Sequence, residues 1–210
     1  MNLSGTGALG SAAVGSDKSF NIGTLALSDG SGESDNYTLS GGTLLLDVTQ
    51  KDISLSGSRV YDGTNAANSG SLSTFSGLIG SETLSVSGSG TVSSALVESS
   101  KVVTLGDLAL ADGSGAAANY NLNGATLDIS KRPVTLTLTR VYDGTTEISG
   151  SDNPSFDNLI GNETLTLSGS GSIGSSGAGN GKSVTLGSLA LSSGTGSESN
   201  YTLTGGTHLA

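Results

Sequence analysis

Two aspartates in glycine-rich turns are the residues of this chain whose type and setting best suit chemistry. Asp62 precedes Gly63 and Asp143 precedes Gly144, each after a tyrosine. Carboxylate oxygens in such turns suit a hard cation such as Ca²⁺. However, Asp-Gly is also typical of an Asx turn that ends a strand, and no second carboxylate recurs beside either aspartate. We therefore interpret both as structural turn residues.

A better calcium candidate is the acidic cluster formed by Asp29, Glu33 and Asp35. Its three carboxylates lie within seven residues of each other in a Gly/Ser-rich segment, which is the setting that Ca²⁺ ligands need. Only Asp29 has an acidic counterpart later in the chain, Asp112. Calcium is the one cofactor that the sequence suggests.

Three further pairs of polar residues recur together: Glu82/Glu163, Lys101/Lys182 and Asn119/Asn200. A lysine and an asparagine beside a buried glutamate could form an intramolecular isopeptide bond, and the alternative is a set of solvated turn residues. N-x-S/T sequons occur at Asn2, Asn36, Asn162 and Asn200. We take these asparagines chiefly as turn residues and keep Asn36, Asn162 and Asn200 as candidate glycosylation sites.

The composition excludes several classes of function. The chain has no cysteine and one histidine, His208, which removes thiolate chemistry and most His-based catalysis. Eight basic residues against 18 acidic ones argue against nucleic acid as a partner. No apolar run approaches the roughly 20 residues of a membrane span, so we expect no membrane insertion. We expect a protein that is not an enzyme.

Internal repetition sets the domain organisation. The blocks at 58–64, 75–90 and 103–115 return 81 residues later, and an incomplete first copy matches at an offset of 83. We expect a partial unit at 1–49 that holds only the C-terminal part, a complete unit at 50–130, and a unit at 131–210 that lacks the end of its last strand. The chain then reads as a fragment of a longer array, with Met1 added.

Alternating apolar and polar residues predict short strands within each unit. Val134, Leu136 and Leu138 form one such apolar face, and Asp-Gly and Ser-Gly pairs separate the strands. About seven strands per unit predict an all-β fold of small Ig-like β-sandwich domains. We expect the units to stand end to end as a rod, because only about two residues link them. A parallel β-helix is the alternative, although its coils repeat every 20–50 residues.

Recurring tyrosines fit this fold. Tyr37, Tyr120 and Tyr201 each follow an asparagine after a polar turn, as a tyrosine corner does in Ig-like domains. We expect their rings in the core and their hydroxyls bonded to backbone.

The recurring blocks resemble the YDG-type repeat domain of large bacterial surface adhesins, including filamentous-haemagglutinin-like proteins exported by two-partner secretion. Val60-Tyr61-Asp62-Gly63, Val141-Tyr142-Asp143-Gly144, "LIGSETL"/"LIGNETL" and the Asn-Tyr-x-Leu segments carry the resemblance. It implies a secreted, cell-surface stalk or spacer involved in cell adhesion and biofilm. The expected partners are neighbouring repeats of the chain and, through the parent adhesin, host or biofilm glycans. The alternative is a module that itself binds glycans or host proteins through its loops.

Overall fold

A computed structural model describes residues 1–40 and 46–209. Within these ranges the fold is all-β, as predicted, and the only helical segments are four single 3₁₀ turns. Apart from the long first and last strands of the middle and last repeats, most strands are short, because the Asp-Gly, Ser-Gly and Gly-Ser pairs of the sequence break the extended backbone after a few residues.

The strands of the first 50 residues bury little of their surface. The elements are β1 (Asn2–Ser4), β2 (Ala8–Leu9), β3 (Gly15–Lys18), β4 (Phe20–Asn21), β5 (Ala26–Ser28), η1 (Ser34–Asn36) and β6 (Leu46–Val48). They pair as β1–β5, β2–β4 and β3–β6, all antiparallel. None of the described residues of this segment is fully buried.

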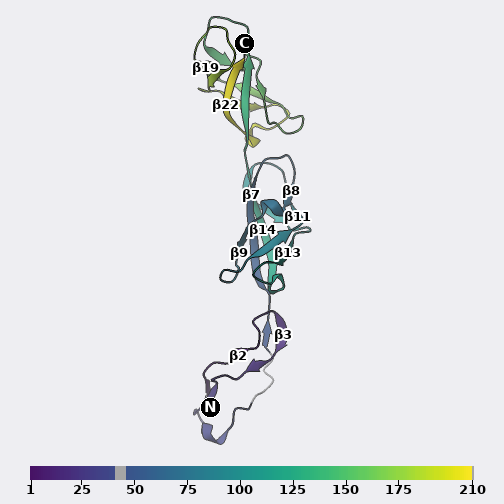
Figure 1. Cartoon of the computed structure of the whole chain (residues 1–210), viewed down its shortest axis with the longest axis vertical. Helices are drawn as coiled ribbons and strands as arrows, with labels where there is room; N and C mark the ends of the chain where they lie inside the picture. The colour runs from purple at the N-terminus through teal and green to yellow at the C-terminus, as the bar shows by residue number, and fades with distance from the viewer. Residues whose placement is uncertain (41–45, 210) are drawn as a thin grey trace. The chain divides into compact units, whose positions relative to one another are not determined.

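The middle repeat contains β7 (Lys51–Val60), β8 (Ala66–Asn68), η2 (Ser69–Ser71), β9 (Thr74–Ser76), β10 (Leu84–Ser87), β11 (Ser89–Val92), β12 (Glu98–Thr104), β13 (Ala109–Asp112), η3 (Ala117–Asn119) and β14 (Tyr120–Ser130). Six of its strands form one sheet in the order β8-β11-β12-β14-β7-β9, and β10 pairs with β13. Figure 1 labels β7, β8, β9, β11, β13 and β14 of this repeat.

The last repeat has the same plan. Its elements are β15 (Arg132–Thr139), β16 (Glu147–Ser149), β17 (Ser155–Phe156), β18 (Leu165–Ser168), β19 (Ser170–Ile173), β20 (Lys182–Thr185), β21 (Ala190–Ser193), η4 (Glu198–Asn200) and β22 (Tyr201–Leu209). The sheet order is β16-β19-β20-β22-β15-β17, which matches the middle repeat strand for strand, and β18 pairs with β21.

The first and last strands of this repeat lie side by side and run parallel. β15 pairs with β22 from Arg132 and Tyr201 at one end to Thr139 and Leu209 at the other. The other described pairs of the repeat are antiparallel. Because its first and last strands are parallel, the chain enters the repeat at one end of the sheet and leaves it at the opposite end.

This mixed sheet differs from both architectures that the sequence suggests. An Ig-like sandwich consists of two antiparallel sheets, so the Ig-like arrangement is not confirmed. The antiparallel neighbours also differ from the coils of a parallel β-helix. Alternation identifies which residues of a strand face the core, but it carries no information about the neighbour with which that strand pairs.

The alternation itself predicted the buried face of β15 correctly. Val134, Leu136 and Leu138 are at most 1% exposed, and the threonines between them face outward or are half-buried. Leu136 and Leu138 belong to a buried cluster with Ile148, Leu167, Ile173 and Leu189.

The described chain divides into two compact units, and the division passes through the middle repeat. One unit comprises Met1–Ser54, Phe75–Ser85 and Leu110–Asn123, and the other comprises Leu55–Thr74, Val86–Ala109 and Gly124–Ala210. The junction between the first segment and the middle repeat therefore lies inside the first unit. The junction between the middle and last repeats lies inside the second.

Candidate functional site

The Val-Tyr-Asp-Gly segments form the same tight turn in both repeats. The Asp62 Oδ1 atom accepts hydrogen bonds from the backbone N–H and the hydroxyl of Thr64, both at 2.9 Å. Asp143 accepts the equivalent bonds from Thr145 at 2.9 and 3.0 Å. These are Asx turns, in which the aspartate bonds to the residue two positions on.

The position directly after the aspartate favours glycine. Gly63 has a φ of +75° and Gly144 a φ of +77°, which a residue with a Cβ atom rarely adopts. An arginine three residues earlier pairs with each aspartate: Arg59 of β7 with Asp62, and Arg140, directly after β15, with Asp143 at 3.3 Å.

The aspartate carboxyls of these turns are stabilised in their ionised form. The pKa of Asp143 is lowered by hydrogen bonds from Thr145 and by the charge of Arg140. Burial opposes the same effect at Asp62, but bonds from Thr64 and Arg59 outweigh it and lower the pKa of Asp62. The oxygens are therefore engaged in holding the turn.

Tyr61 reaches out of this turn into the last repeat. Its side chain is 4% exposed, and its hydroxyl donates a hydrogen bond to the Glu163 Oε1 atom at 2.7 Å. The ring meets that of Tyr201 edge to face, with centroids 5.5 Å apart and planes at 80°. This contact joins residues that are 102 positions apart.

The backbone of Tyr61 is fixed as well. Its N–H donates to the Ser130 carbonyl at 2.9 Å, and the Arg132 guanidinium donates to its carbonyl at 3.3 Å. Both partners lie at the link between β14 and β15. Gly63 then packs against Ile160, since a Cβ atom on this glycine would lie 2.8 Å from the Ile160 Cγ2 atom.

Glu163 lies between two tyrosines. The Tyr201 hydroxyl donates to the Glu163 Oε2 atom and accepts from the Ile160 backbone N–H at 3.1 Å. Gly196 leaves the space for the carboxylate, because a Cβ atom there would lie 2.7 Å from Oε2. We call Ile160, Glu163, Asn200 and Tyr201 the Glu163 socket.

The socket disfavours ionisation of the tyrosine that it holds. Burial first, and then the hydrogen bond and charge of Glu163, raise the pKa of Tyr61 to about 12, against an opposing hydrogen bond from Asn200. Burial and Glu163 also raise the pKa of Tyr201. Both phenols are therefore neutral donors to the carboxylate at neutral pH.

Asn200 connects the socket to the backbone of the middle repeat. It is 2% exposed, and its Oδ1 atom accepts a hydrogen bond from the Val97 backbone N–H at 3.1 Å. The first unit contains the same contact, since Asn119 Oδ1 accepts from the Val14 N–H at 2.9 Å. The offsets of 81 and 83 residues show that both junctions use equivalent residues.

The middle repeat also contains the other socket residues. The Tyr120 hydroxyl donates to Glu82 Oε2 and accepts from the Ile79 N–H at 3.2 Å. The hydrogen bond to Glu82 raises the pKa of Tyr120. Ile79, Glu82, Asn119 and Tyr120 therefore form the Glu82 socket, the equivalent of the Glu163 socket one repeat earlier.

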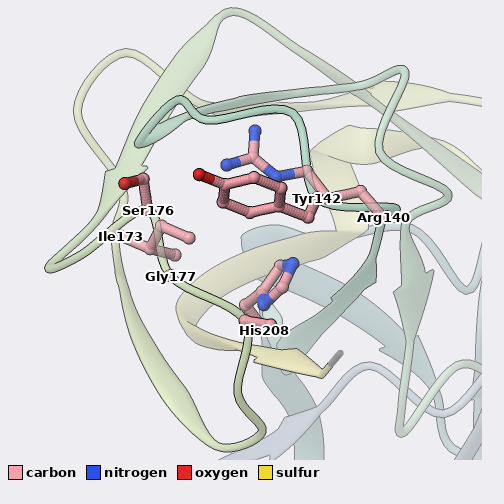
Figure 2. A pocket seen from close by; sticks show the side chains of 7 residues that line it. Arg140, Tyr142, Ile173, Ser176, Gly177 and His208 are labelled. Atoms are coloured by element: carbon pink, nitrogen blue, oxygen red, sulfur yellow. The ribbon is translucent and has the colours of Figure 1, made fainter.

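Tyr142 lies in a different setting from Tyr61. It is 65% exposed and the preceding Val141 is 90% exposed. Its ring lines a cavity of about 30 Å³ with Arg140 and His208 (Figure 2). That volume holds about one water molecule. The cavity is too small to be a substrate site.

His208 is the one residue of this cavity with catalytic potential, and its setting offers no partner. It is 5% exposed, and neither ring nitrogen bonds to a protein group among the described residues. Its equivalent in the middle repeat is Leu127, which is 0% exposed. His208 therefore occupies a core position.

The calcium candidates are not assembled into a metal site. Asp29 Oδ1 accepts a hydrogen bond from the Ser34 N–H at 2.6 Å, which lowers the pKa of Asp29. In residues 1–40 and 46–209 no group of three acidic or histidine residues is placed to hold a metal ion. Glu33 and Asp35 thus do not join Asp29 around a common point. The carboxylate of Asp29 instead closes a local turn.

The recurring lysines also have partners other than those of an isopeptide bond. Lys101 is 5% exposed and its Nζ atom bonds to Ser94 at 3.0 Å and to Glu98 at 2.6 Å. Glu82 bonds to Tyr120 instead. The glutamate that recurs with this lysine and asparagine thus accepts a hydrogen bond from a tyrosine.

Of the three predicted tyrosine corners two are buried, and of the three candidate glycosylation sites two are exposed. Tyr120 and Tyr201 are 4% and 1% exposed, whereas Tyr37 is 59% exposed, since residues 1–40 contain no counterpart of Ile79 and Glu82. Asn36 and Asn162 are exposed, but Asn200 is buried in the socket and has no room for a glycan.

The role of the socket glutamates was not predicted from the sequence. Their signal was nevertheless present, because Glu82 and Glu163 recur at the spacing of the Val-Tyr-Asp-Gly segments in a chain that is 46% Ser, Thr and Gly. The recurrence of Gly115 and Gly196, which make room for these carboxylates, belongs to the same signal.

The fold and the sockets define a class: tandem all-β repeats in which a tyrosine of one repeat docks on a glutamate of the next. The YDG domain family matches residues 47–127 and 130–208, so the chain belongs to the YDG domain family. No curated protein and no solved structure matches the chain. Among the described residues no helix is long and apolar enough to cross a membrane.

Proposed function

We propose that this chain is a load-bearing spacer of a secreted bacterial surface adhesin, which holds a distal binding region away from the cell. The parallel pairing of β15 with β22 is the observation that carries the proposal. Force applied through the chain pulls the two strands in opposite directions along their length. All hydrogen bonds of the ladder are then loaded together rather than one at a time.

The junction contacts support the same role. Tyr61 and Asn200 each contact both repeats with a buried side chain, and Arg132 donates to the carbonyl of Tyr61 across the link. Such contacts limit rotation about a link that is otherwise a single residue between β14 and β15. A spacer needs this resistance to bending, and a catalyst or a flexible linker has no use for it.

The adhesin assignment comes from the resemblance of the Val-Tyr-Asp-Gly and Asn-Tyr-x-Leu blocks to repeats of large surface adhesins. The expected location is outside the cell. Antibodies raised against this chain should label intact cells that express the parent protein. Labelling only after lysis would contradict a surface location and leave the mechanical proposal standing.

Single-molecule pulling tests the mechanical proposal with two attachment geometries. The chain has no cysteine, so P133C/L209C attaches at opposite ends of the parallel pair, and P133C/T202C attaches at one end. All three positions are exposed. We expect unfolding of the first variant to need a several-fold higher force, because its ladder is sheared rather than unzipped. Equal forces would refute a load-bearing role for the ladder.

A further inference from the structure

The Glu82 socket lines a cavity that the Glu163 socket does not have. Ile79, Glu82, Asn119 and Tyr120 border a space of about 260 Å³. In the Glu163 socket the equivalent position holds the ring of Tyr61. The 210 residues contain two Val-Tyr-Asp-Gly segments, and neither Tyr61 nor Tyr142 lines this cavity.

The residues that hold the docked turn of Tyr61 and Gly63 have counterparts in the wall of this cavity. Tyr61 contacts Ser130, Arg132, Glu163, Asn200 and Tyr201, and Gly63 of the same turn packs against Ile160. The residues 81 positions earlier are Thr49, Lys51, Ile79, Glu82, Asn119 and Tyr120, and all six line the cavity. The cavity thus offers a carbonyl for the tyrosine N–H, a cation for its carbonyl and a carboxylate for its hydroxyl.

The other wall of the cavity is also equivalent. Ala12, Ala13 and Val14 line it, and Val14 donates to Asn119 as Val97 donates to Asn200. The socket is therefore assembled around the space, and the hydroxyl-accepting carboxylate is held in place by Tyr120. Because the side chains of such a site are already in place, ordering them on binding costs little free energy.

We propose that the Glu82 socket binds the Val-Tyr-Asp-Gly turn of another YDG repeat, with the tyrosine hydroxyl donating to Glu82. The exposed turn of this chain has the right form: Tyr142 is 65% exposed, and its Asp143 and Gly144 adopt the geometry of the docked turn. The socket is then a recognition site for a Val-Tyr-Asp-Gly turn, used through the same contact that links the middle and last repeats of this chain.

A peptide with the sequence of residues 137–146 is the probe, titrated into the ¹⁵N-labelled full chain. Burial of a single side chain predicts a Kd on the order of 100 μM. The signals of the Ile79 amide and the Asn119 side chain should shift. Those of Ile160 and Asn200 should not, because Tyr61 already fills their socket. Absence of shifts at about ten times that concentration overturns the proposal.

Three variants sharpen the titration. A peptide with phenylalanine in place of Tyr142 should bind at least about tenfold more weakly, because it loses a charge-assisted hydrogen bond. Glu82→Gln in the chain should weaken binding similarly, whereas Glu163→Gln should leave it unchanged. Equal affinity of the two peptides, or equal effects of the two chain variants, would overturn the assignment.

The Glu163 socket supplies a test by gain of a site. Tyr61→Ala empties this socket, so the stoichiometry should rise from one peptide to two, and the Asn200 signal should now move. A folded Tyr61→Ala chain that still binds one peptide contradicts the proposal. If that variant unfolds, the Glu82→Gln and Glu163→Gln comparison still decides. Failure of all peptide binding would leave the force measurements on P133C/L209C unaffected.

Discussion

Removal of a single oxygen atom from Tyr61 should loosen the junction between the two complete repeats. Tyr61→Phe keeps the ring, which is 4% exposed and packs on Tyr201, and deletes the hydroxyl that bonds to Glu163 at 2.7 Å. A hydrogen bond to a charged group contributes about 1.5–3 kcal/mol. Glu163 keeps its bond from Tyr201 in the variant, so we expect a loss near the lower end, about 1.5–2 kcal/mol.

Tyr142→Phe is the matched control for this prediction. It makes the same chemical change in the same sequence motif, but Tyr142 is 65% exposed, so the free energy of unfolding should change by less than about 0.5 kcal/mol. Urea denaturation followed by far-ultraviolet circular dichroism measures both variants. Tyrosine fluorescence gives a second probe, since the chain has five tyrosines and no tryptophan.

A double-mutant cycle with Glu163→Gln isolates the pair. Glu163 also bonds to Tyr201, so its single substitution costs more than the contact with Tyr61 alone. The coupling between Tyr61→Phe and Glu163→Gln should be about 1–2 kcal/mol, as for directly bonded residues. Equal effects of Tyr61→Phe and Tyr142→Phe, or a coupling near zero, would refute the view that this hydrogen bond holds the junction.

Three further outcomes follow from the structure. The pKa of Tyr61 is raised from 10.0 to about 12. The neutral phenol therefore contributes its full stabilisation below pH 10, and this contribution disappears as the pH rises to 12. Between pH 9 and 12 the melting temperature of Tyr61→Phe should fall less than that of the wild type. His208→Leu replaces a buried ring with two unpaired nitrogens by the leucine that the middle repeat has at this position. The change should stabilise the last repeat by about 1–3 kcal/mol, measured by thermal melting. A lower melting midpoint would contradict this. Gly63→Ala and Gly144→Ala both strain a backbone at positive φ, but only the Cβ atom at position 63 would lie 2.8 Å from the Ile160 Cγ2 atom. The denaturation midpoint should therefore fall further for Gly63→Ala than for Gly144→Ala. Equal falls would argue against close packing at Ile160.

Local features of the fold followed from the sequence because their causes are local. The alternation at Val134, Leu136 and Leu138 predicted the buried face of β15, since successive side chains of a strand point to opposite sides. The Asp-Gly pairs predicted tight turns, since glycine alone adopts the positive φ of Gly63 and Gly144 without strain.

The pairing of the strands did not follow in the same way. A buried alternating strand can form part of an Ig-like sandwich or of a mixed sheet, and the parallel match of β15 with β22 joins strands at the two ends of the repeat. The sequon at Asn200 suggests an exposed asparagine, but Asn200 is buried. Its burial depends on the Val97 backbone more than 100 residues away.

The sequence by itself determined the repeat length, the all-β class and the Asx turns at Asp62 and Asp143. Repetition is visible by comparing the sequence with itself, and strand alternation and turn formation depend on residues that are neighbours in the chain. Only the tertiary structure decided what the chemically suggestive residues do. The aspartates hold turns, while Glu82 and Glu163 receive tyrosines. The physical reason is that a hydrogen bond between residues 102 positions apart forms only when two separately folded surfaces meet, and no local pattern encodes that encounter.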